Sequence, residues 1–239
     1  MRRATGVTLP VVKDSDYAAR RGELKRTPDT NLIVLGNMDS SGMVTYLSHM
    51  GYCTVDTLNP GKGGYQIRTV HDPWGVGVNV IVLTGSDLDG VRLAVDGFCS
   101  RLAGGETLVI PRTIEVGFSA EMLNRSPNLG LDPSDEEIAR QLKETEAAFR
   151  AGAQGGMFNP IVAAGGSYTS TGHEGYAKLF RELMFLADRL SVEGQGSFGG
   201  PWGAAADFLF GPLITAWDNV EESPSLTDQD RERILDIIL

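Results

Sequence analysis

The stretch from residue 64 to residue 102 constrains the fold more than any other part of the chain. The segment Tyr65–Val70 alternates apolar with polar side chains, which predicts a half-buried strand. Residues 71–78 hold one Pro and two Gly and predict a turn. Residues 80–83 are all β-branched or aliphatic, which predicts a strand buried on both faces. The turn at Gly85-Ser86-Asp87 then offers an oxygen that can cap a helix. That helix carries an apolar stripe at steps of three and four residues: Leu88, Val91, Val95, Phe98 and Leu102.

Composition and charge limit the class of protein. The chain has 239 residues, of which 41% are hydrophobic and 22% charged, as is usual for a soluble globular protein. No apolar run approaches the ~20 residues that span a bilayer, so we expect no membrane segment. Residues 1–30 lack the apolar core of a signal peptide. The net charge is −10, although the first 26 residues are basic. An acidic body excludes an extended nucleic-acid surface, and we interpret the basic start as a solvated loop.

The first 36 residues are predicted to contain two strands separated by a loop. Residues 7–12 are short, apolar and interrupted by Pro10, which favours an edge strand. Residues 14–29 are predicted to form a charged surface loop, and residues 31–36 a second buried strand.

A second helix and further strands complete the first half. Ser40 or Ser41 can cap a helix with Met43, Val44, Leu47 and Met50 on its inner side, and Gly51 can end it. Residues 107–110 and 113–118 add one bent or two short strands. Alternating strands and helices indicate an α/β or α+β sandwich.

Composition changes at residues 124–133, where Asn, Ser, Pro and Gly cluster. We therefore predict an α/β domain over residues 1–123, a linker over 124–133 and a helical domain over 134–239. The overall fold class is α+β.

The helical domain has three predicted helices before its last one. Asp132 and Pro133 open the first, which runs to Arg150 with Ile138, Leu142 and Phe149 inward. Residues 173–190 form the second, with an apolar stripe of Tyr176, Leu179, Leu183, Ala187 and Leu190. Residues 201–220 form the third, kinked at Pro212.

The final helix starts at a capping box, Thr227 to Asp230, and places Ile234, Leu235 and Ile238 inward. It is still apolar at Leu239, so we expect it to need further packing partners. We interpret the chain as a fragment of a longer protein whose remainder is its natural partner.

The strand segments of the first half also carry a family resemblance. They are Thr8-Leu-Pro-Val-Val12, Asn31-Leu-Ile-Val-Leu-Gly36, Gly64-Tyr-Gln-Ile-Arg68 and Asn79-Val-Ile-Val-Leu-Thr-Gly-Ser-Asp87. In this order they resemble the small accessory domain that precedes the catalytic domain of many carbohydrate-active enzymes. Its best-known forms are the β-hexosaminidase second domain and the α-glucuronidase N-terminal domain. A strand and a helix precede the first segment in that family, so the resemblance implies a domain truncated at its front.

Two segments of the second half resemble turns of an (α/α) toroid. The segment Tyr168-Thr-Ser-Thr-Gly172-His-Glu-Gly-Tyr176 is similar to the turn between toroid helices, with His173 where an acid is usual. The segment from Ala216 to Arg231 is similar to the next helix pair. Such toroids occur in heparinase-like and alginate-type polysaccharide lyases and in several glycosidases. Their catalytic residues mostly lie further along the chain, so the resemblance assigns none here.

Aromatic rings that stack on sugars, together with carboxylates that take the hydroxyls, point to four substrate-binding candidates: Tyr168, Trp202, Trp217 and Asp218. For each Trp, packing in a helix core is the competing interpretation. The adjacent His173 and Glu174 invite an acid–base interpretation, but the start of a helix explains them better. His71 and Asp72 are likewise interpreted as a structural loop.

Other cofactor and metal chemistry finds little support. Residues 35–42 join a strand to a helix but lack G-x-G-x-x-G, and Asp39 would repel a phosphate. Cys53 and Cys99 have no metal-ligand spacing. They can form a disulfide if the fold brings them together, although two buried free thiols are the simpler interpretation. We predict no metal and no cofactor.

These observations favour a piece of a carbohydrate-active enzyme, a glycoside hydrolase or polysaccharide lyase, whose substrate is a poly- or oligosaccharide. The acidic helical half favours a hydrolase over an enzyme for strongly anionic glycans. The alternative is a non-catalytic module that binds glycan or organises domains. Location in the cell stays open: with a signal peptide upstream, the protein is secreted or periplasmic.

Overall fold

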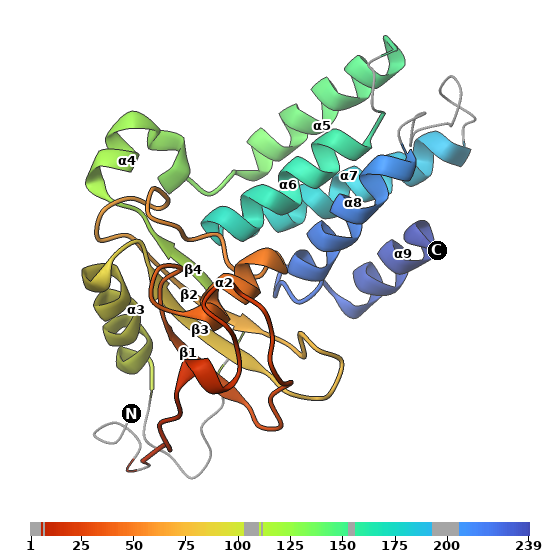
Figure 1. Ribbon diagram of the computed structural model, residues 1–239. Helices are drawn as coiled ribbons and strands as arrows, with labels where there is room; N and C mark the ends of the chain where they lie inside the picture. Colours follow the sequence, from red (N-terminus) through yellow and green to blue (C-terminus); the bar gives the residue numbers. More distant parts are fainter. Residues whose placement is uncertain (1–5, 7, 103–109, 111, 153–155, 193–205) are drawn as a thin grey trace. The chain divides into compact units, whose positions relative to one another are not determined.

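The computed structural model describes residues 6, 8–102, 110, 112–152, 156–192 and 206–239. This part of the chain has an α+β fold with a mixed four-stranded sheet and eight α-helices (Figure 1). It divides into two units, Met1–Gly130 and Leu131–Leu239, and the sheet lies entirely in the first. Residues 124–133, predicted to be a linker, include the end of helix α4 (Ala120–Arg125) and a 3-10 turn, η2 (Pro127–Gly130).

The sheet of the first unit has the strand order β1-β3-β2-β4. Strand β1 (Leu32–Gly36) runs parallel to β3 (Val80–Gly85). Strand β2 (Tyr65–Val70) lies antiparallel to both β3 and β4 (Ile114–Gly117). The two central strands are therefore the two that the sequence predicts most directly.

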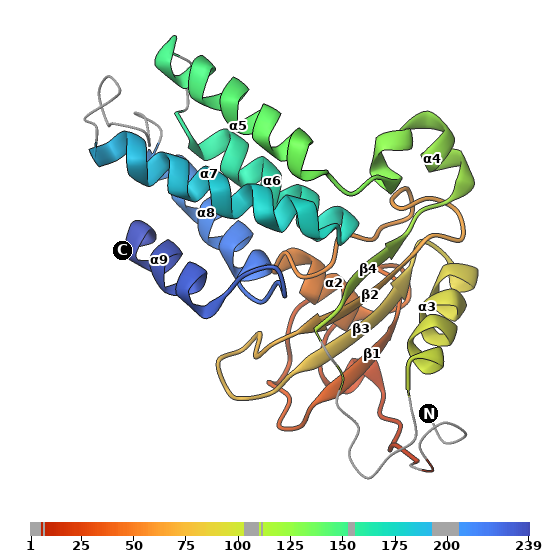
Figure 2. The same cartoon turned by 180° about the vertical axis from the view of Figure 1, so that it is seen from behind.

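Two helices pack on opposite faces of this sheet (Figure 2). Helix α2 (Gly42–His49) and helix α3 (Leu88–Ser100) bury different side chains because successive strand residues point to opposite faces. One apolar layer includes Val34, Val70, Val80 and Val82 with Met43, Val44 and Leu47. The other includes Ile67 and Leu83 with Ala94 and Phe98.

The turn between β3 and α3 is built as predicted, around Asp87. Its carboxylate accepts hydrogen bonds from Gly90 N at 2.9 Å and from Gly63 N at 3.0 Å. These backbone N–H groups hold the pKa of Asp87 below its ordinary value. Helix α3 packs closely against the segment before β2 because Gly90 has no side chain. A methyl group on Gly90 would lie 2.1 Å from the carbonyl oxygen of Gly64.

Helix α2 confirms one of the two predicted caps. The hydroxyl of Ser41 accepts a hydrogen bond from Val44 N at 3.1 Å, so Ser41 is the cap rather than Ser40. Gly51 follows the helix with φ +80°, the left-handed conformation that commonly ends a helix.

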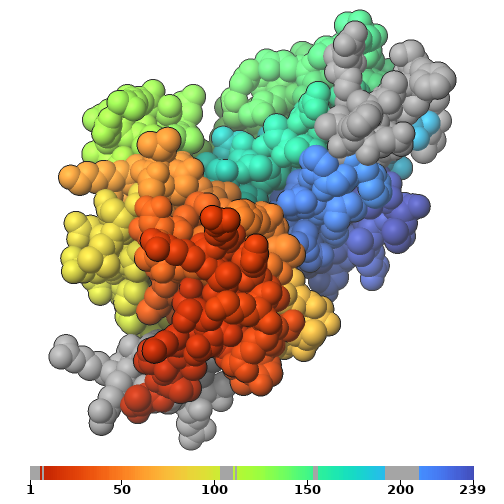
Figure 3. All heavy atoms as spheres, in the orientation of Figure 1, coloured from red at the N-terminus to blue at the C-terminus, as the bar shows by residue number. Residues whose placement is uncertain are grey.

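The N-terminal segment differs from its prediction. The described residues 8–12 form no strand and are exposed, because Pro10 cannot donate to a ladder and no described strand pairs with them. Residues 14–29 are more than a surface loop: Tyr17 and Ala18 are buried in the core, after a 3-10 turn, η1 (Asp14–Asp16). Figure 3 shows the N-terminal part, in red and orange, spread over the face of this unit that is turned to the viewer.

Burial along the strands and helices also corrects four predictions. Strand β1 is an edge strand rather than a fully buried one, and Val34 is its one buried residue. Gln66 and Arg68 of β2 are buried rather than exposed, because β2 is central in the sheet. Leu88 and Met50 stand at helix ends, outside the packed layers, and are 62% and 41% exposed.

All the regular secondary structure described in the second unit is helical. Its helices are α5 (Asp135–Arg150), α6 (Phe158–Thr171), α7 (Glu174–Val192), α8 (Ala206–Val220) and α9 (Asp228–Ile238). Helix α8 contains Pro212, and α9 begins at the predicted capping box of Thr227 and Asp230.

These helices pack in two rows. Helix α6 packs against α7 and α8, and α7 packs against α5 and α9, so helices two apart in sequence lie side by side. Helix α7 lies between α5, α6 and α9 and buries the predicted positions Leu179, Leu183, Ala187 and Leu190. Tyr176 on the same predicted stripe is only half-buried.

Two predictions for this unit need correction, and one helix has no counterpart among the predictions. Helix α5 is capped by Ser134, whereas the carboxylate of Asp132 accepts a hydrogen bond from Gly175 N at 2.7 Å, on another helix. Helix α6 was not expected, because its sequence is rich in Gly, Ser and Thr. Leu235 is 41% exposed, since the buried side of α9 centres on Ile234.

Candidate functional site

The structure separates the four predicted substrate-binding residues. Tyr168 lies in α6 and is 1% exposed, and Trp217 lies in α8 and is 5% exposed. The Trp217 ring stacks on Phe180, with centroids 6.3 Å apart and planes inclined by 20°. Asp218 is half-buried, whereas Trp202 lies outside the described residues. Rings this deeply buried present almost no face to a ligand, which leaves Asp218 as the accessible described candidate.

Tyr168 belongs to a polar cluster centred on Glu174 at the start of α7. The Tyr168 hydroxyl donates to Glu174 Oε1 at 3.3 Å. The hydroxyl of Ser225 donates to Glu174 Oε2 at 2.7 Å, and the hydroxyl of Ser223 donates to the same oxygen. Three hydroxyl groups from outside α7 therefore converge on one carboxylate.

Arg231 of α9 extends the Glu174 cluster. Its guanidinium donates to the carbonyl oxygens of Glu221 and Ser223, the latter at 3.0 Å, and forms an ion pair with Asp228 at 2.8 Å. The loop between α8 and α9 is thus held from both sides, by Glu174 and by Arg231. Because the carboxylate of Glu174 is occupied by protein hydroxyls, its geometry fits a structural role better than general acid–base chemistry.

His173 precedes this cluster at the turn between α6 and α7. Its backbone N–H donates to the Thr171 hydroxyl at 3.2 Å, and its ring centroid lies 6.5 Å from that of Tyr176. Gly172 supports the turn with φ +74°. The turn between α6 and α7 is thus short, and the rest of the segment that resembles a toroid turn belongs to the two helices.

In the first unit, the start of α2 is the junction of strand and helix at which a nucleotide phosphate could bind. The carboxylate of Asp14 occupies it: Asp14 Oδ2 accepts from Gly42 N at 2.8 Å, and Oδ1 accepts from Met43 N at 3.0 Å. The hydroxyl of Ser41 also donates to Asp14 Oδ1, at 2.9 Å. The N–H groups at the start of α2 that could bind a phosphate are already bonded to the carboxylate of Asp14.

The loop at His71 and Asp72 is held by a similar arrangement. Asp72 accepts hydrogen bonds from Val76 N at 2.7 Å and Gly77 N at 2.8 Å. Although desolvation acts in the opposite direction, these N–H groups hold the pKa of Asp72 below its ordinary value. The side chain of Asp72 therefore holds the shape of this loop by accepting hydrogen bonds from the loop's backbone N–H groups.

The described residues contain no metal site and no disulfide. Within the described ranges, no group of three or more His, Cys, Asp or Glu side chains could hold a metal ion. Cys53 and Cys99 are both free thiols, and burial raises the pKa of Cys53. None of the helices in the described part is long and apolar enough to cross a membrane.

The sequence pattern gives no sign of the roles of Ser223 and Ser225. They stand about fifty residues from Glu174, and a Ser-Pro-Ser segment between helices resembles an ordinary loop. Comparison with known proteins adds no further assignment: no family model, curated protein or solved structure matches the chain.

Proposed function

We propose that the chain is part of a carbohydrate-active enzyme, in which an accessory α/β domain precedes the first hairpins of an (α/α) toroid. The two-row packing of the helical unit is the observation that supports this proposal. Helices α6 and α8 form one row, and α5, α7 and α9 form the other. In an array of helical hairpins, each hairpin covers a face of its neighbour in this alternating way.

Two contacts tie the successive hairpins together. A methyl group on Gly165 would lie 2.6 Å from the Ala216 side chain, so α6 and α8 approach very closely. The Glu174 cluster joins the α6–α7 turn to the loop between α8 and α9. Tyr168 and Trp217 then act from within the unit, by holding the helices that present substrate-binding groups.

In this proposal Asp218 contacts the substrate. It is half-buried near the end of α8, beside the core residue Trp217. A carboxylate in such a position can accept hydrogen bonds from sugar hydroxyls, and its backbone is fixed by a packed helix. No catalytic residue is assigned.

The test incubates the full-length protein that contains this chain with neutral polysaccharides and with uronate-containing polysaccharides, because the resembled enzymes carry most of their catalytic residues further along the chain. Release of reducing ends without ultraviolet absorbance identifies a hydrolase, and release of an unsaturated, ultraviolet-absorbing product identifies a lyase. Binding in affinity electrophoresis without release supports the alternative, a non-catalytic glycan-binding module. The proposal would be overturned if the protein neither bound nor cleaved any of these polysaccharides.

The substitution Asp218→Asn isolates the proposed contact. It should weaken glycan binding by about tenfold, because the half-buried carboxylate of Asp218 is replaced by an amide and its charge-assisted hydrogen bonds to sugar hydroxyls are lost. The matched control is Asp236→Asn, on the exposed side of α9, which should bind like the unchanged protein. Equal binding by both variants would remove Asp218 from the site.

A further inference from the structure

Strand β1 is an end strand of the sheet and has one open side. Leu32 N donates to Asn79 O at 3.0 Å, so Leu32 directs its backbone groups toward β3. Backbone groups alternate in direction along a parallel strand, and Ile33 and Leu35 therefore direct theirs away from β3. No described strand pairs with β1 on that side.

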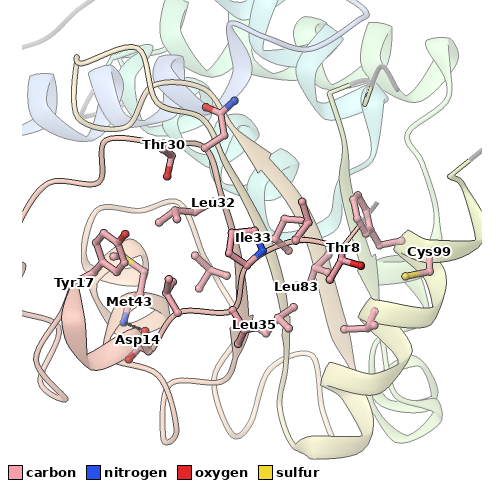
Figure 4. A pocket seen from close by; sticks show the side chains of 18 residues that line it. Thr8, Asp14, Tyr17, Thr30, Leu32, Ile33, Leu35, Met43, Leu83 and Cys99 are labelled. Atoms are coloured by element: carbon pink, nitrogen blue, oxygen red, sulfur yellow. Dashed lines mark hydrogen bonds between the residues drawn. The ribbon is translucent and has the colours of Figure 1, made fainter. Parts of the chain in front are cut away.

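A groove of about 680 Å³ runs along this open side (Figure 4). Figure 4 shows Tyr17 and Met43 at one end, Cys99 at the other, and Leu32 and Ile33 between them. The groove therefore reaches both apolar layers of the unit. Tyr17 and Met43 belong to the α2 layer, while Cys99 belongs to the α3 layer.

The lining of the groove is apolar and almost uncharged. Asp14 is the one ionisable carboxylate among the described lining residues, and Ser41, Gly42 and Met43 already hold both its oxygens. The Leu35 side chain, which lines the groove, is 54% exposed, so the groove is open to solvent at this end of β1. An occupant that fits must be uncharged and must satisfy backbone donors and acceptors.

We propose that this groove binds an extended segment of a partner protein, which adds to the sheet beside β1 as a fifth strand. A strand alternates its side chains between two faces, and both faces would here meet an apolar layer. The segment is therefore apolar on both sides, unlike the alternating strand of a half-exposed sheet. It pairs with the five residues of β1, so its contacting length is about 17 Å at roughly 3.4 Å per residue.

Two other occupants fit the groove less well. A small apolar molecule would fill the walls but would leave the N–H and C=O groups of Ile33 and Leu35 without partners. A second copy of this chain would bring its own β1 together with α3 and residues 8–12, which line the groove, so its strand could enter only with these elements beside it. A single strand is thin enough to enter between the two layers.

The probe is a fluorescein-labelled peptide with the sequence of residues 79–85, Asn-Val-Ile-Val-Leu-Thr-Gly, and lysines at both ends for solubility. This sequence already forms the strand that pairs with the other side of β1. We expect saturable binding by fluorescence polarisation. Hydrogen exchange at the Ile33 and Leu35 amides should slow by at least about tenfold, because new backbone hydrogen bonds form there. The Val34 amide, directed toward β3, should not change.

Two control peptides separate the contributions of backbone and side chains. A peptide with lysines at the positions of Ile81 and Leu83 can form the same backbone bonds but places charge in one wall. A peptide with N-methylated backbone keeps the side chains but cannot pair. Each should bind at least about tenfold more weakly.

Matched variants of the protein test the location. Leu35→Glu lies in the groove and should weaken peptide binding at least about tenfold, whereas Leu88→Glu, at a similarly exposed leucine outside it, should not. Val95→Glu, in the groove, and Leu93→Glu, an exposed residue outside it, extend the comparison to α3; because Val95 packs partly against the core, melting curves must show that its variant folds. Several results would overturn the proposal: equal binding by matched variants, peptide binding without protection of Ile33 and Leu35, or concentration-dependent dimers that protect them. No binding of the peptide while a small apolar dye fills the groove would overturn it as well.

Discussion

Ser41 and Asp14 share one hydrogen bond that joins the N-terminal segment to a helix. The Ser41 hydroxyl donates to Asp14 Oδ1 at 2.9 Å while it accepts from Val44 N at 3.1 Å. Asp14 also accepts from the backbone N–H groups of Gly42 and Met43. The first turn of α2 is thus capped by two residues that are far apart in the sequence, and a negative charge sits at the positive end of the helix.

We expect Asp14→Ala to destabilise the first unit by about 1–3 kcal/mol, because two backbone N–H groups of α2 lose their acceptor and the helix start loses a favourable negative charge. The measurement is urea unfolding followed by circular dichroism. Asp16→Ala is the matched control, since Asp16 lies in the same 3-10 turn and is exposed. In a double-mutant cycle with Ser41→Ala, the coupling energy should be at least about 0.5 kcal/mol. Additive effects of the two substitutions would contradict the shared hydrogen bond.

Two neighbouring glycines of α6 should respond oppositely to alanine. At Gly165 a methyl group would lie 2.6 Å from Ala216 Cβ, whereas at Gly166 it would meet nothing within 4 Å. We expect Gly165→Ala to lower the free energy of unfolding by about 1–3 kcal/mol through overpacking. Gly166→Ala should raise it by about 0.5–1 kcal/mol through helix propensity. Thermal melts of both variants provide the comparison, and equal shifts would show that α6 and α8 are not in close contact.

Local patterns predicted the centre of the sheet well because the physical cause lies within a few residues. Asp87 caps the helix that starts one residue later, and the apolar run at residues 80–83 forms the most buried strand. Thr227 and Asp230 form their capping box for the same reason. These contacts need no knowledge of the rest of the chain.

Features that depend on distant partners could not be predicted in this way. Burial of Gln66 and Arg68 follows from the central position of β2, which no periodicity reveals. The partners of Glu174 are about fifty residues away, and the carboxylate of Asp14 reaches a helix 28 residues later. The candidate Tyr168 lies in the last turn of α6, and its burial follows from the packing of α6 against α7 and α8.

The Glu174 cluster should contribute strongly to the stability of the helical unit. Glu174→Ala leaves the hydroxyls of Ser223 and Ser225 without their acceptor, so we expect a loss of about 2–3 kcal/mol. Tyr168→Phe removes one hydroxyl and should cost about 1 kcal/mol. Hydrogen exchange should show faster opening of α8 and α9 in the Ala variant. The control Glu136→Ala, at an exposed position in the first turn of α5, should leave their exchange unchanged.

Glu146 gives the helical unit a pH-dependent link between α5 and α7. Its carboxylate accepts from Arg189 at 2.9 Å and from Arg150 at 2.7 Å. These hydrogen bonds, first from Arg189 and then from Arg150, lower the pKa of Glu146 from 4.5 to about 2. The folded-state pKa lies below the unfolded value, so the stabilisation is complete above pH 4.5 and is lost as the pH falls toward about 2.

We expect Glu146→Gln to be less stable than the unchanged protein at neutral pH, by about 0.5–1 kcal/mol, because the pair is partly exposed and screened by salt. The difference should shrink as the pH falls below 4.5 and should be nearly gone at about pH 2, where the unchanged carboxylate is itself being protonated. Glu144→Gln is the matched control: Glu144 pairs with Arg140 of the same helix and is 61% exposed, so its effect should be smaller. Unfolding by urea at a series of pH values measures both variants. A Glu146→Gln effect that stays constant from neutral pH to about pH 2 would mean that packing, rather than the charge of Glu146, stabilises the contact between α5 and α7.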